Sequence, residues 1–81
     1  MTVAKLLTAL RELPFVRSAV AEPDEVGWKI TVHKYIRLYR RPLQMSLIIS
    51  DGILDYDPDT VRIVSELLQE AEDSVEPPVY T

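Results

Sequence analysis

The chain has 81 residues with a net charge of −4, 47% hydrophobic and 27% charged residues, and no cysteine. This length predicts one α+β domain over 1–75 and a flexible, proline-containing tail over 76–81. The lack of cysteine excludes disulfides and thiolate metal sites, and it favours a cytoplasmic protein. No apolar stretch is long enough to span a bilayer, so we expect no membrane contact.

The net charge conceals a strong separation of charge along the chain. Residues 29–50 contain five cations and no acid, whereas residues 51–81 contain nine acids and one cation, Arg62. The acidic total disfavours non-specific binding of nucleic acid, because the overall field repels phosphate. A local basic patch can still dock an acidic partner.

The first predicted element is a helix over about residues 3–12. Thr2 is a suitable N-cap, and Pro14 ends the pattern by excluding the helical conformation at the residue before it. The apolar residues recur at the spacing of one buried helical face, namely Val3, Leu6, Leu7, Leu10 and Leu13.

Three strands are predicted next, over 15–21, 28–39 and 43–50. In the second of them, even positions such as Ile30 and Val32 are apolar except at Lys34, while odd positions are basic, polar or aromatic. Because alternate residues of a strand point to opposite faces, we expect one face to be buried and the other to be basic and aromatic.

The Asp51-Gly52 pair predicts a two-residue type I′ hairpin that leads into a return strand over 53–56. Asp57 then suits an N-cap and Pro58 the first position of a second helix, which we expect to run to about Ser74. Its apolar face comprises Val61, Val64, Leu67, Leu68 and Ala71.

The resulting order is α-β-β-β-β-α. We predict an α+β, two-layer domain in which two helices cover one face of a four-stranded, mainly antiparallel sheet. The opposite face would then carry the candidate binding residues, which are Lys29, His33, Tyr35, Arg37, Tyr39 and Arg41.

No catalytic constellation, cofactor site or metal site is predicted, and we expect a protein that is not an enzyme. His33 is the only histidine, and its separation in the chain from Ser46 or Ser50 lends no support to a catalytic pair. Asp55, Asp57, Asp59 and Glu66 occupy ligand positions of a calcium loop, but that loop requires a glycine where this chain has Thr60.

The sequence favours a small interaction module or regulator that binds a protein partner, a second copy included, through the sheet face or a strand edge. One alternative is a nucleic-acid-binding regulator that uses the basic-aromatic strand 29–41. Another is an acidic inhibitor that mimics nucleic acid through Glu66, Glu70, Glu72 and Asp73. The tail segment 77–80, PPVY, resembles a ligand of WW domains, although three fixed residues make a weak match.

Overall fold

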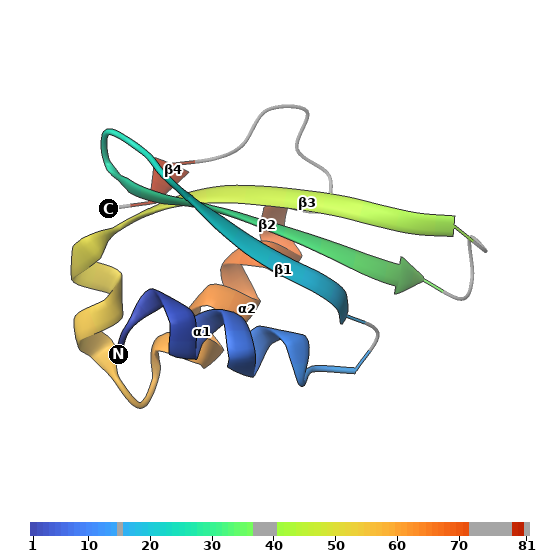
Figure 1. The fold of residues 1–81 in the computed structure, drawn as a ribbon, viewed down its shortest axis with the longest axis horizontal. Coiled ribbons are helices and arrows are strands. Elements are labelled where there is room, and N and C mark those ends of the chain that lie inside the picture. Colours follow the sequence, from blue (N-terminus) through green and yellow to red (C-terminus); the bar gives the residue numbers. More distant parts are fainter. Residues whose placement is uncertain (15, 37–40, 72–78, 81) are drawn as a thin grey trace.

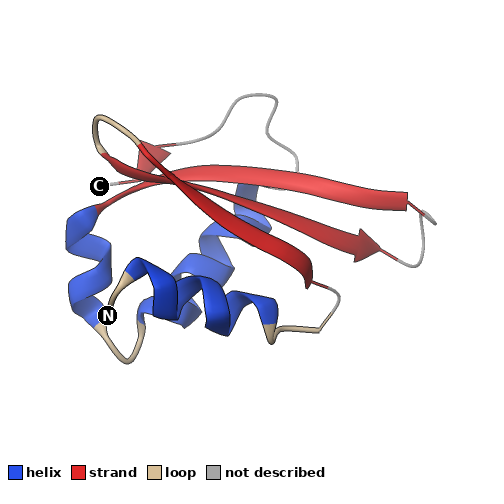
Figure 2. Cartoon of the chain, in the orientation of Figure 1, coloured by secondary structure: helices blue, strands red, loops and turns tan. Residues whose placement is uncertain are grey.

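The computed structural model describes residues 1–14, 16–36, 41–71 and 79–80, with only the backbone at 35–36, 41–42 and 79–80. Its elements, in chain order, are α1 (Val3–Arg11), β1 (Val16–Pro23), β2 (Gly27–Ile36), β3 (Arg41–Ser50), the 3-10 helix η1 (Asp51–Tyr56), α2 (Thr60–Ala71) and β4 (Val79–Tyr80). The two α-helices lie together beneath one face of the sheet (Figures 1 and 2), so the fold is α+β with a helical layer and a sheet layer.

The sheet is built from three antiparallel strands in the order β1-β2-β3, and the two-residue β4 lies parallel to β3. Register places Ala19 opposite Val32 and Val32 opposite Met45. All three side chains are at most 3% exposed. The apolar alternation predicted from the sequence is therefore confirmed, since even positions of β2 face the helices.

The core lies between the helices and this face of the sheet. Leu6 and Leu10 of α1 and Val64 of α2 are fully buried, and they pack with Ile30 and Leu47 of the central strands. The helical spacing of apolar residues in the sequence therefore identified the buried face of each helix.

The first helix begins as predicted. Thr2 is extended, and its Oγ1 accepts a hydrogen bond of 3.2 Å from the backbone N–H of Lys5. This bond satisfies one of the N–H groups that lack a partner at the start of any helix. The helix ends at Arg11, with Glu12 as its C-cap.

The prediction of a four-stranded, mainly antiparallel sheet in the order α-β-β-β-β-α is wrong. Residues 51–56 form the 3-10 helix η1, so the antiparallel sheet has three strands. A type I′ hairpin at Asp51-Gly52 requires positive φ, but no glycine of the described chain has it. In η1 the consecutive residues Ile53 and Leu54 are both buried, whereas a strand would send them to opposite faces.

Hydrogen bonds from two distant segments hold η1 against the helical layer. The buried Thr60 hydroxyl of α2 donates to the Ile53 carbonyl at 3.1 Å, and the amino group of Met1 donates to the Leu54 carbonyl at 2.9 Å. Neither contact can be read from local sequence, because the partners are 7 and 53 residues apart.

The second helix begins later than predicted. A turn closed by the Asp59 N–H and the Tyr56 carbonyl, at 2.7 Å, follows η1, and the Asp57–Pro58 peptide bond is cis. The helix starts at Thr60, so Asp57 and Pro58 are not its N-cap and first residue. Its predicted end near Ser74 lies outside the described residues. Within the described chain, no helix is long and apolar enough to cross a membrane.

Candidate interaction surface

The face of the sheet opposite the helices is the candidate functional surface. Three cross-strand rows, set by the register, make up what we call the open face: Glu22, Lys29 and Ile48; Val20, Thr31 and Ser46; and Ser18, His33 and Gln44. Because strands alternate, every one of these positions lies opposite the residues that pack against α1 and α2.

The structure places two of the six predicted binding residues on the open face. Lys29 and His33 are half-buried there. The side chains of Tyr35 and Arg41, and the whole of residues 37–40, lie outside the described residues. The basic-aromatic character predicted for this surface therefore stays a prediction beyond Lys29 and His33.

Polar side chains on the open face are joined across the strands. Ser18 Oγ of β1 and His33 Nδ1 of β2 are 3.0 Å apart, and the serine donates when Nδ1 carries no proton. The hydroxyl oxygens of Thr31 and Ser46 are 3.2 Å apart on the next row. Each of these contacts restricts the rotamers of the two side chains that it joins.

Sequence reasoning did not find Ser18, Thr31 or Ser46 as parts of this surface. His33 contacts Ser18 of β1, where a bulge between Val16 and Ser18 sets the register against β2. On the other side, the register of β3 places Gln44 opposite His33, whereas Ser46 and Ser50 lie opposite Thr31 and Gly27. No carboxylate in the described part of the chain hydrogen bonds to His33, so this Ser–His pair lacks the third group that orients a catalytic base.

The acidic run around η1 and α2 does not converge on a cation site. Arg62 lies 4.0 Å from Asp59 and 3.3 Å from Glu66, so it draws two of the four candidate calcium ligands to itself. Across the described ranges, no group of three or more histidine, aspartate or glutamate side chains could hold a metal ion.

The β1 edge of the sheet has features that disfavour pairing with a further strand. The Arg11 guanidinium of α1 donates two hydrogen bonds, of 3.2 and 2.8 Å, to the Ala19 carbonyl. The strand also contains a bulge and ends at Pro23, and both features discourage the addition of a strand. This edge is therefore a poorer candidate for docking than the open face.

The opposite edge involves the tail motif PPVY. The backbone of Val79 and Tyr80 pairs with Ile48 and Ile49 of β3, while residues 77–78 lie outside the described residues. Paired strand residues cannot at the same time enter a WW domain as a polyproline II segment, because that mode leaves the backbone unpaired.

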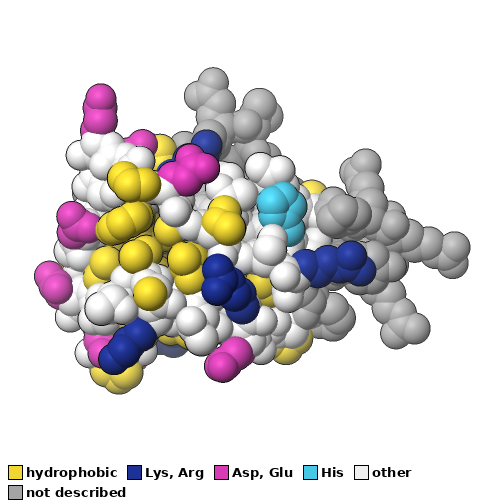
Figure 3. Space-filling model, in the orientation of Figure 1, with side chains coloured by type: hydrophobic (Ala, Val, Ile, Leu, Met, Phe, Trp, Pro, Cys, Tyr) yellow, Lys and Arg dark blue, Asp and Glu magenta, His cyan; other side chains and the backbone are white. Residues whose placement is uncertain are grey.

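Apolar surface adjoins the open face at the hairpin end of the sheet. Figure 3 shows hydrophobic side chains gathered over the β1–β2 hairpin and the region between it and α1. Val20, which belongs to the open face, is 46% exposed, and Val26 in the hairpin is 38% exposed. An interface on the open face would therefore combine polar rows with apolar contacts at one end.

Comparison of the chain with protein-family models, with curated proteins and with solved structures finds no match. The chain is thus defined by its geometry as a small α+β domain in which no described helix covers the second face of the sheet.

Proposed function

We propose that this protein is a non-enzymatic interaction module that binds a protein partner in the cytoplasm through the open face. The observation that supports the proposal is the position of both helices on one side of an antiparallel sheet, so that no described helix covers the other side. Ordered hydroxyl groups, a half-buried histidine and an exposed valine provide both polar and apolar contacts there.

The size of the open face sets the strength of the interaction. Strands β2 and β3 have ten residues and β1 has eight. With about 4.8 Å between strands and about 3.3 Å per residue, they give a surface of roughly 14 by 31 Å, or about 430 Å². A stable complex buries about 800 Å² on each partner, so the open face alone fits a weak, transient complex. On the open face, Lys29 is the described lysine that would pair with an acidic group of the partner.

The proposal is tested by comparing matched charge reversals. Lys29→Glu changes the open face, whereas Lys5→Glu makes the same change on the exposed side of α1. A partner captured from native lysate should be retained by the wild type and by Lys5→Glu and lost by Lys29→Glu, after nuclease treatment. If the partner is a second copy of the chain, light scattering should show a dimer for the wild type and Lys5→Glu and a monomer for Lys29→Glu.

Two results would contradict the proposal. Capture that disappears on nuclease treatment would instead support the nucleic-acid-binding alternative, with the steep salt dependence that phosphate contacts produce. Equal capture by the two variants would place the binding surface elsewhere. The acidic helix is one such place, although the ion pair between Arg62 and Glu66 partly neutralises it.

A further inference from the structure

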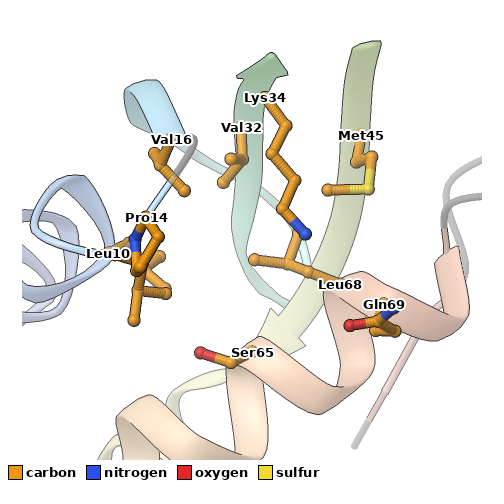
Figure 4. A pocket seen from close by; sticks show the side chains of 10 residues that line it. Leu10, Pro14, Val16, Val32, Lys34, Met45, Ser65, Leu68 and Gln69 are labelled. Atoms are coloured by element: carbon orange, nitrogen blue, oxygen red, sulfur yellow. The ribbon is translucent and has the colours of Figure 1, made fainter. Parts of the chain in front are cut away.

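A pocket lies on the other side of the sheet from the open face. It has a volume of about 220 Å³ and opens between the end of α1, the middle of α2 and strands β2 and β3. Leu10, Val32, Met45 and Leu68 provide much of its apolar lining, and these side chains converge from four different elements (Figure 4).

One cation lines this apolar space. Lys34 follows Ile30 and Val32 on the helix-facing side of β2, and its amino group is directed toward Leu68 and Gln69 of α2 (Figure 4). The Lys34 side chain is half-buried, and a charged group that is removed from water needs an anionic or hydrogen-bonding partner. No described residue, however, forms a side-chain hydrogen bond or ion pair with the Lys34 ammonium group.

The other polar groups of the pocket do not serve as that partner. The Ser65 hydroxyl donates to the Val61 carbonyl at 2.7 Å within α2. Gln69 presents an amide, which carries no charge. The described lining thus combines an apolar interior, one ammonium group that no described residue neutralises and an amide that can donate a hydrogen bond.

We propose that this pocket binds a small carboxylic acid with an apolar body. The carboxylate would pair with the Lys34 ammonium and accept from the Gln69 amide, while the apolar body would contact Leu10, Val32, Met45 and Leu68. A dry apolar cavity of about 150 Å³ accepts benzene, so a pocket of 220 Å³ accommodates a body of one aromatic ring or a short alkyl chain.

The proposal does not depend on the proposed function, since the two surfaces lie on opposite sides of the sheet. Strand β2 contains one lysine on each side of the sheet, so the two surfaces can be tested with the same substitution. Lys34 lines the pocket, whereas Lys29 is on the open face. Removing one charge therefore tests the pocket, and removing the other tests the partner surface.

The experiment is a titration of the full chain with benzoate and, separately, with benzyl alcohol, followed by NMR of the methyl groups. Benzoate should shift the methyl resonances of Leu10, Val32, Met45 and Leu68 and the side-chain resonances of Lys34. Benzyl alcohol has the same ring without the charge, and it should bind at least about tenfold more weakly, because charge-assisted hydrogen bonds are the stronger ones.

Two variants complete the experiment. Lys34→Met keeps most of the side-chain volume and should weaken benzoate binding about tenfold while leaving benzyl alcohol unchanged. Lys29→Met should leave both affinities unchanged. The proposal is overturned if benzoate shifts no pocket methyl group, if acid and alcohol bind equally, or if Lys34→Met binds benzoate as the wild type does. The comparison of benzoate with benzyl alcohol uses the wild-type protein, so it tests the proposal even if Lys34→Met does not fold.

Discussion

Alanine substitution of the two glycines gives opposite expected effects on stability. At Gly27 an added Cβ would lie 2.5 Å from the Ile49 carbonyl oxygen and 2.9 Å from the Asp51 nitrogen, both of which are backbone atoms. At Gly52 the nearest atom would be Ser50 Oγ, at 3.6 Å, which is ordinary contact. The first position therefore requires glycine, and the second does not.

The magnitudes follow from these distances. A carbon–oxygen contact is comfortable at about 3.3 Å, so Gly27→Ala must separate β2 from the end of β3 by roughly 0.8 Å. Crowding of this kind costs about 1–3 kcal/mol, and a loss of 2 kcal/mol lowers the Tm of a domain of this size by about 8–16 °C. Gly52→Ala should instead raise stability by about 0.4–1 kcal/mol, because alanine restricts the unfolded chain and φ is compatible.

Thermal and urea unfolding followed by far-ultraviolet circular dichroism measures both effects. The Gly52 result also tests η1 itself. In a type I′ hairpin, alanine at this position would adopt positive φ and lose about 1–2 kcal/mol. A destabilised Gly52→Ala variant, or a Gly27→Ala variant as stable as the wild type, would refute the account of this junction.

Two further substitutions are expected to separate buried contacts from exposed ones. Thr60→Val removes the only hydroxyl that bonds the buried Ile53 carbonyl in the described structure, and it should lower the free energy of unfolding by about 1–3 kcal/mol. Thr8→Val on the exposed side of α1 should lower it by at most about 0.5 kcal/mol. Urea unfolding measures both losses. A Thr60→Val loss no larger than that of Thr8→Val would contradict the role of this bond. Arg11→Met removes two hydrogen bonds to the edge strand β1. It should lower the free energy of unfolding by about 1 kcal/mol and increase self-association at high concentration. Arg62→Met, the control, should change the free energy of unfolding by less than about 0.5 kcal/mol. Light scattering that shows no difference between these two arginine variants would count against protection of the β1 edge.

The candidate site could be predicted only in part from the sequence. Alternation placed Lys29 and His33 on the same side of one strand, and both lie on the open face. The neighbours of His33 could not be found in this way, because they depend on how β1 is aligned with β2. The bulge after Val16 sets that alignment and brings Ser18 to the histidine.

The sequence by itself determined the features that depend on local period and local chemistry. These are the capped first helix, the alternation along the strands, and the apolar face of the second helix. Such features follow from residues within a few positions of one another, where 3.6-residue and two-residue periods and the Thr2 cap act directly.

Only the tertiary structure decided how residues 51–56 fold and what surrounds Lys34. The Asp51-Gly52 pair favours a hairpin locally, but η1 buries both Ile53 and Leu54 and satisfies their carbonyls with groups from α2 and the N-terminus. Lys34 interrupts an apolar row in the sequence, yet its pocket exists only where two helices and two strands meet. Burial and hydrogen bonds between distant segments contribute more free energy than a single turn preference, and a linear sequence does not display them.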